Sequence, residues 1–144
     1  MEQNWYDFIK TEFEVADRDI RTYSPLTLAY IGDGVFDLII RSVVVGTGNT
    51  SPNKLHQHTS GIVKATTQSA MIDALEELLT EEEADVYRRG RNAKSHSVAK
   101  NASVSDYRKA TGFEALMGYL YLTNRMDRMV ELIRLGVAKC NVDL

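Results

Sequence analysis

The chain has 144 residues, of which 44% are hydrophobic, and a formal net charge of −3 at pH 7. This length suits one domain, and the hydrophobic content argues against an intrinsically disordered chain. No apolar run approaches the roughly 18 residues that a membrane-spanning helix requires. The single cysteine, Cys140, has no partner for an intrachain disulfide, so we expect a reducing, cytoplasmic setting.

The N-terminal segment, residues 1–21, is predicted to be an acidic helical extension. Trp5, Phe8 and Phe13 recur at helical spacing among several acidic residues. We therefore expect a helix that docks onto the main domain, which we place at residues 22–144.

Two Ser-Pro pairs predict the starts of the next helices. In Ser24-Pro25 and Ser51-Pro52, a serine that can cap a helix precedes a proline suited to the first turn. The first helix is expected to run to about Val45, before the Gly-Thr-Gly-Asn sequence. The second is expected to continue as one long helix to about Leu79.

The C-terminal half is also predicted to be helical. Thr80 and Glu83 match the capping-box pattern, which favours a helix through Arg89. Residues 91–102 lack apolar periodicity and are expected to form a loop. Helices are predicted over residues 107–122, with a possible cap from Ser103 to Asp106, and over residues 126–138. Because no segment shows the alternation of a strand, the predicted fold class is all-α.

Two acidic residues interrupt helices that are otherwise apolar. Asp33 lies in the sequence LAYIGDGVFDLII and Glu114 in the sequence GFEALMGYLYL. A buried carboxylate is costly unless it is paired, protonated or bound to a metal. On facing helices the two could hold a cation that prefers oxygen ligands, such as Mg²⁺. A buried salt bridge with Arg41 or Arg125 is the alternative, and spacing alone does not decide between them.

Glycines accompany both acids. Gly32 and Gly34 flank Asp33, and Gly118 lies one turn beyond Glu114. Glycine inside a helix costs about 1 kcal/mol relative to alanine. Its use here suggests that another backbone or a ligand approaches closely.

Positive charge is concentrated in residues 85–109. This segment holds seven basic and two acidic residues, a net charge of +5, which leaves −8 for the rest of the chain. Such asymmetry fits a phosphate-binding face on an acidic body, although a solvated charged loop would look the same. The basic residues are Arg88, Arg89, Arg91, Lys94, Lys100, Arg108 and Lys109.

Both acidic helices resemble the catalytic helices of the ribonuclease III family. Residues 28–38 are similar to its signature helix, with the Gly-Asp pair, and residues 113–118 to its second catalytic helix. The sequences RGRNAK at 89–94 and YRKATG at 107–112 resemble Mini-ribonuclease III, the short form without a separate double-stranded-RNA-binding domain. The resemblance covers roughly residues 22–138.

By this resemblance, Asp33 is the catalytic aspartate and a metal ligand, and Glu114 is the second catalytic metal ligand. Two further acids of the full-length family pattern are replaced here by Ala29 and Thr111. Mini-ribonuclease III is similar in this respect.

Two other acids are candidates for indirect roles around the metal. Asp37 lies one turn after Asp33, on the same helical face. Asp106 precedes Glu114 by about two turns. We expect either to act through water rather than as a direct ligand.

The resemblance implies a helical homodimer with the ribonuclease III catalytic-domain fold. The implied activity is an endoribonuclease that depends on Mg²⁺, or Mn²⁺ in its place, cuts double-stranded RNA and leaves 5′-phosphate ends. Precursor 23S ribosomal RNA is the implied substrate, and the basic residues are expected to hold the duplex. Two alternatives remain: a catalytically silent RNA-binding or ribosome-associated dimer, and a helical dimer in which Asp33 only forms a salt bridge.

Overall fold

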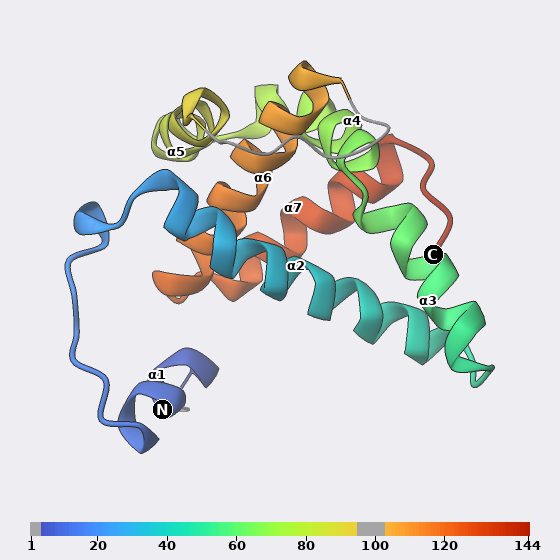
Figure 1. Cartoon of the computed structure of the whole chain (residues 1–144), viewed down its shortest axis with the longest axis horizontal. Coiled ribbons are helices and arrows are strands. Elements are labelled where there is room, and N and C mark those ends of the chain that lie inside the picture. The colour runs from blue at the N-terminus through green and yellow to red at the C-terminus, as the bar shows by residue number, and fades with distance from the viewer. Residues whose placement is uncertain (1–3, 95–102) are drawn as a thin grey trace.

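A computed structural model describes residues 4–94 and 103–144, and these residues form helices without any strand. The all-α prediction is confirmed. Figure 1 shows α6 crossing α2 at the centre, with the remaining helices of the body packed around this pair. The elements in chain order are α1 (Trp5–Glu12), η1 (Ile20–Thr22), α2 (Pro25–Thr47), α3 (Pro52–Val63), α4 (Ala65–Leu75), η2 (Glu76–Leu78), α5 (Glu81–Asn92), α6 (Val104–Leu122) and α7 (Met126–Lys139).

The predicted helix caps are present. The side chains of Ser24 and Ser51 accept hydrogen bonds from the backbone three residues onward, which starts α2 and α3. Thr80 and Glu83 form the complete capping box of α5. Ser103 caps α6 by accepting from the backbone N–H of Asp106 at 3.0 Å. Each cap satisfies an N–H group that a helix start leaves without a partner.

The long helix expected between Pro52 and Leu79 is wrong, because the chain breaks at Lys64. This residue has extended backbone angles, and α3 ends before it while α4 begins after it. Two polar side chains of α4 donate hydrogen bonds to backbone carbonyl groups near the end of α3. The Thr67 hydroxyl donates to Gly61 O at 3.0 Å, and the Gln68 amide donates to Val63 O at 2.7 Å. The expected loop at 91–102 begins later than predicted, since α5 continues to Asn92; residues 95–102 lie outside the described part.

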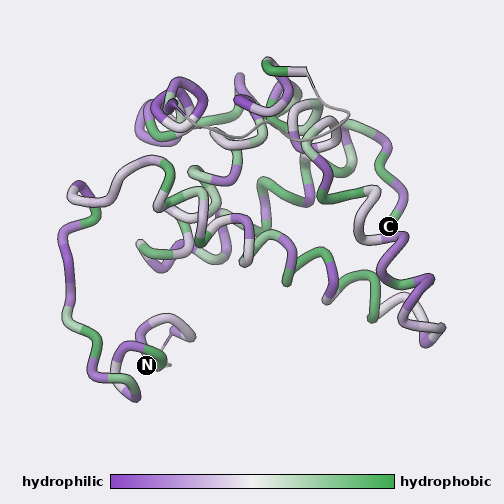
Figure 2. Tube along the Cα trace, viewed as in Figure 1, coloured by the Kyte–Doolittle hydropathy of each residue, from purple (hydrophilic) through white to green (hydrophobic). Residues whose placement is uncertain are grey.

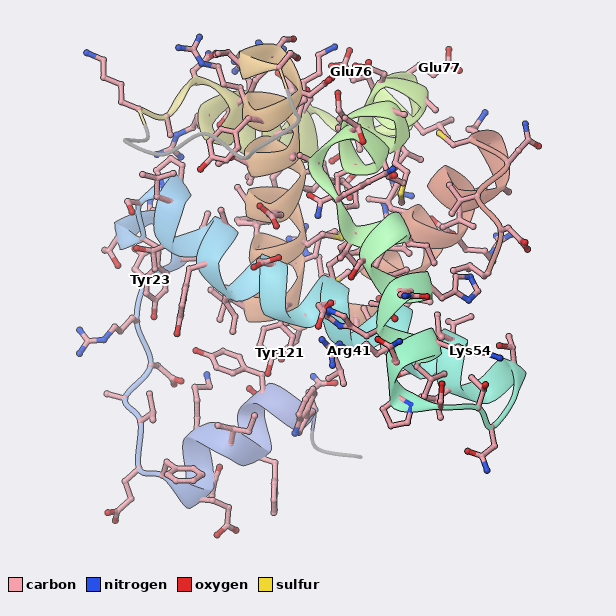
Figure 3. The ribbon with its side chains drawn as sticks, turned by 45° about the vertical axis from the view of Figure 1, so that its right-hand side comes forward. Tyr23, Arg41, Lys54, Glu76, Glu77 and Tyr121 are labelled. Atoms are coloured by element: carbon pink, nitrogen blue, oxygen red, sulfur yellow. The ribbon has the colours of Figure 1, made fainter. Side chains whose placement is uncertain are left out.

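The N-terminal helix contacts the body through aromatic side chains. Trp5 and Tyr6 pack against Tyr121, with ring centroids 6.2 and 5.2 Å apart, and Figure 3 shows Tyr121 extending toward α1. The helix buries none of its own residues. An extended stretch of chain connects α1 to the body (Figure 1). Phe13 follows the last residue of α1, and its side chain is 77% exposed. The expected helix exists but is shorter and less buried than its pattern suggested.

Glycines bring α2 and α6 into backbone contact. A Cβ atom at position 32 would lie 1.8 Å from the carbonyl oxygen of Glu114, and one at position 118 would lie 1.9 Å from the carbonyl oxygen of Leu28. Beside this crossing, the fully buried rings of Phe36 and Phe113 meet edge to face at 5.2 Å. Only glycine permits helices to approach this closely.

Gly32→Ala should therefore destabilise the protein strongly, by about 3 kcal/mol or more, since the new methyl group meets backbone that cannot turn away. Gly61→Ala is the matched control, because a Cβ atom there meets nothing within 4 Å on α3. It should raise stability by up to about 1 kcal/mol through helix propensity. Urea unfolding of both variants tests this, and equal stability of Gly32→Ala and wild type would contradict the close crossing.

Candidate functional site

The crossing of α2 and α6 places Asp33 beside Glu114. Asp33 follows the contact residue Gly32 directly, and Glu114 supplies the backbone oxygen at that contact. The two carboxyl groups interact by hydrogen bonding and by charge repulsion. Asp33 is exposed and Glu114 is partly buried, so the pair extends from the core to a surface that a large substrate can reach.

Burial and the neighbouring acid together perturb Glu114. Desolvation, then the hydrogen bond and the charge of Asp33, raise the pKa of the Glu114 carboxyl group to about 9. Without a bound cation the pair therefore holds a proton at neutral pH. A carboxyl group with so perturbed a pKa, in the middle of a largely buried helix, is typical of functional sites.

The salt-bridge alternative receives no support from the described residues. Arg41 pairs with Asp37 at 2.7 Å, and Arg125 pairs with Glu82 at 3.2 Å; Arg41 is labelled in Figure 3. No ion pair within residues 4–94 and 103–144 includes Asp33 or Glu114. Two acids meet here without a compensating positive charge from that part of the protein.

The two acids expected to act indirectly have other partners. Asp37 is engaged with Arg41. Asp106 accepts a hydrogen bond from the hydroxyl of Ser69 at 2.8 Å and lies in the first turn of α6. Eight residues of helix, about 12 Å along the axis, separate it from Glu114. Neither acid forms an interaction with Asp33 or Glu114 that the described contacts record.

The positions that depart from the family pattern offer no carboxylate. Ala29 is buried, and Thr111 is buried with its hydroxyl donating to the backbone oxygen of Tyr107 at 3.0 Å. Within the described residues, no cluster of three or more His, Cys, Asp or Glu side chains is arranged to hold a metal ion. Among the described residues, two carboxylates, those of Asp33 and Glu114, thus form this site.

Oxygen donors of this kind fit a hard divalent cation. Mg²⁺ commonly binds through one or two carboxylates and keeps several waters and substrate phosphate oxygens as further ligands. The proton held by the Asp33–Glu114 pair supplies positive charge that no described side chain provides. The carboxylates therefore suit Mg²⁺ or Mn²⁺, and binding would release that proton.

One further polar residue beside Glu114 was missed by sequence reasoning. Gln68 on α4 is 2% exposed, and a hydrogen-bonding interaction of its side chain lowers the pKa of Glu114, against the larger raising effects. Its amide oxygen is buried without a hydrogen-bond partner among the described residues. The signal in the sequence was a glutamine at a core position, hidden because the helix break at Lys64 was not foreseen.

The basic residues divide into paired and unpaired cations. Arg88 pairs with Asp85, and Lys109 pairs with Asp73 at 3.0 Å. Arg91 lies over the Tyr87 ring, 5.5 Å from its centroid. Arg89, Lys94 and Arg108 are exposed, and the described residues provide no ion-pair partner for them. Lys100 lies outside the described residues.

The end of α5 and the start of α6 bring several of these cations together. A shallow hollow of about 360 Å³ lies there, lined by Arg91, Asn92, Val104, Ser105, Arg108 and Lys109. Some of the basic residues of the 85–109 segment are therefore close together in the structure, although ion pairs neutralise two of the seven, Arg88 and Lys109.

Comparisons with known proteins agree with these observations. Residues 26–125 match the model of the Ribonuclease III domain. A Mini-ribonuclease 3 from Enterococcus faecalis is 48% identical over 85% of this chain and 94% of its own length, and one from Clostridium tetani is 47% identical over 86% of this chain and 83% of its own length.

A solved structure also shares the fold. A protein from Fusobacterium nucleatum superimposes with a TM-score of 0.76 and 29% identity, covering 85% of this chain and 98% of that protein.

The raised pKa of Glu114 predicts an unusual pH dependence of stability. An unfolded chain releases this proton near the ordinary value of 4.5, whereas the folded site retains it to about pH 9. The unfolded state thus binds fewer protons between these values, and the metal-free protein should lose stability as pH rises through this window. Glu114→Gln removes the effect. At pH 8 in EDTA we expect this variant to be more stable than wild type by at least about 1.4 kcal/mol, the equivalent of one pKa unit.

Thermal unfolding from pH 5 to 9 measures this difference. The gap between the two proteins should widen with rising pH. Parallel curves for wild type and variant would show that Glu114 titrates normally.

Proposed function

The chain belongs to the ribonuclease III family, and from this premise we propose that it is a Mg²⁺-dependent endoribonuclease that cuts double-stranded RNA by phosphodiester hydrolysis. The observation that carries the proposal is the meeting of Asp33 and Glu114 without a cation from the described residues. Mn²⁺ is expected to support the same activity in place of Mg²⁺. Products with 5′-phosphate ends, and precursor 23S ribosomal RNA as substrate, are finer parts of the proposal that derive from the resemblance to Mini-ribonuclease III.

In the proposed mechanism, the carboxylates of Asp33 on α2 and Glu114 on α6 would hold the cation. The ion would supply the positive charge that stabilises a phosphate under attack and makes water a better nucleophile. Glu114 must give up its proton to bind, and Asp33 presents its carboxylate to the solvent side, where the RNA backbone arrives. The rigid crossing at Gly32 fixes the distance between the two acids.

Duplex RNA would be held through its shape. Its major groove is too deep and narrow for side chains to read, so proteins contact phosphates and 2′-hydroxyl groups instead. Exposed cations such as Arg89, Lys94 and Arg108 suit this role, and Lys100 is proposed with them. Arg88, Arg91 and Lys109 are also proposed, although each already has a partner within the protein.

A homodimer is part of the proposal. Several apolar side chains on α2 remain exposed in the single chain, namely Leu26, Tyr30, Leu38 and Val45, and Figure 2 shows how apolar residues recur along this helix. A second copy packed against α2 would cover them and set two catalytic pairs across one duplex.

None of the described helices has the length and apolar character needed to cross a membrane. We propose that the enzyme acts in the cytoplasm.

Asp33→Asn should abolish cleavage of duplex RNA in Mg²⁺ while leaving the helical content and the oligomeric state unchanged. The amide keeps the shape of the side chain but removes the charge that binds the cation. Gel analysis of a labelled RNA hairpin, with a single strand of the same sequence beside it, measures the loss. Asp127→Asn is the control, because this exposed acid starts α7 away from the crossing.

The same assay distinguishes the silent RNA-binding dimer, which the acids missing at Ala29 and Thr111 bring into consideration. Metal-independent binding of the duplex, with no product at any Mg²⁺ or Mn²⁺ concentration, would favour that alternative. Full activity of Asp33→Asn would remove the central claim.

Arg108→Ala should weaken duplex binding and reduce the slope of log affinity against log salt concentration by about 1, as the loss of one phosphate contact requires. Arg88→Ala is the matched control because Asp85 already neutralises this arginine; its effect should be smaller. Binding titrations from 50 to 200 mM salt with Asp33→Asn as background measure both slopes. Identical slopes for wild type and Arg108→Ala would exclude Arg108 from the RNA interface.

A further inference from the structure

The buried amide of Gln68 has a geometry that a purely structural role does not explain. Gln68 lies in the first turns of α4, and its side-chain nitrogen donates to Val63 O at 2.7 Å, across the break between α3 and α4. That carbonyl can only accept, so the atom facing it must be the amide nitrogen rather than the oxygen. The orientation of the amide is thereby settled.

Once the nitrogen is assigned, the amide oxygen has no hydrogen-bond partner among the residues that the structure describes. Oε1 of Gln68 is buried and receives no hydrogen bond from any described residue, in a side chain that is 2% exposed. Buried acceptors are satisfied in nearly all native proteins, and an exception calls for an explanation such as an unseen water or ion. Capping the end of α3 requires only the nitrogen.

The neighbour of this amide is the candidate metal site. The Gln68 side chain interacts with the carboxyl group of Glu114, and α4 packs along α6. Ser69, the next residue, bonds to Asp106 at 2.8 Å, and Lys109 pairs with Asp73 at 3.0 Å, so side chains of both helices hold them together directly after Gln68. The position of the amide relative to Glu114 is therefore constrained.

We propose that Gln68 is a positioning residue of the metal site: its amide nitrogen orients the Glu114 carboxylate, and its amide oxygen accepts a hydrogen bond from a water molecule bound to the cation. This inference rests on the proposed function, because it assumes that Asp33 and Glu114 bind Mg²⁺ or Mn²⁺. Ions with few protein ligands depend on such outer contacts, whose loss typically weakens metal affinity by roughly 10- to 100-fold. Gln68 thus partly compensates for the carboxylates missing at Ala29 and Thr111.

The test is the affinity for Mn²⁺ alone, followed by the electron paramagnetic resonance signal of the free ion, without RNA. Gln68→Leu keeps the side-chain bulk but removes the amide, and its dissociation constant for Mn²⁺ should rise roughly 10- to 100-fold. Gln68→Met keeps the length of the side chain and also lacks the amide, so it should weaken Mn²⁺ binding to a similar extent. Thr59→Val, another buried polar residue, on α3, should leave the affinity unchanged.

Melting temperatures in EDTA separate stability from metal binding. If Gln68→Leu only removed a helix cap, its melting temperature would fall while Mn²⁺ affinity, measured well below that temperature, stayed at the wild-type value; this overturns the proposal. If Gln68→Leu fails to fold, Gln68→Met decides, since Mn²⁺ affinity equal to that of wild type would overturn the proposal.

Failure of the proposed function gives a different pattern. Wild type that binds no Mn²⁺, or binds it equally well after Asp33→Asn, would refute the Asp33–Glu114 metal site itself. Wild-type binding that is lost in Asp33→Asn but unaffected in Gln68→Leu would refute only the role of Gln68.

Discussion

The site depends on the backbone contact between α2 and α6. Glycine at positions 32 and 118 lets each helix touch a carbonyl of the other, which is closer than helices with side chains at the contact can pack. Asp33 and Glu114 lie beside this contact, which sets the distance between them. Two helix backbones are much stiffer than two loops, so the acids need no rearrangement to meet. The cost of glycine inside helices is offset by a preorganised pair of carboxyl groups.

That preorganisation creates an electrostatic problem within the metal-free protein. Burial and the proximity of Asp33 oppose ionisation of Glu114 and raise its pKa to about 9, while Arg41 and Arg125 are committed to Asp37 and Glu82. An arginine placed against the acids would stabilise them, but it would also occupy the position in which we propose that a cation binds. The proposed site would thus gain its ability to bind a cation at the cost of stability in the metal-free protein, a conflict that many active sites share.

Local sequence signals predicted the helices and the two acids, whereas long-range contacts determined the rest. Ser24, Ser51 and Thr80 cap helices by accepting hydrogen bonds from the backbone three residues later, so the sequence alone predicts their roles. The break at Lys64 has no proline or glycine and depends on Thr67 and Gln68 bonding back to α3. Likewise, the ion pair of Lys109 with Asp73 joins different helices. Charge counting along the chain therefore overestimated the free positive charge.

The reduced set of acids has a consequence for how metal and RNA bind. Ala29 and Thr111 provide no carboxylate, and the Thr111 hydroxyl donates a hydrogen bond to the backbone of its own helix. A cation held by Asp33 and Glu114 would keep most coordination positions for water and phosphate oxygens. Because a phosphate that fills such a position binds the ion and the protein together, metal and duplex should strengthen each other's binding by an equal factor. In this way the domain would gain affinity for RNA from the bound ion itself.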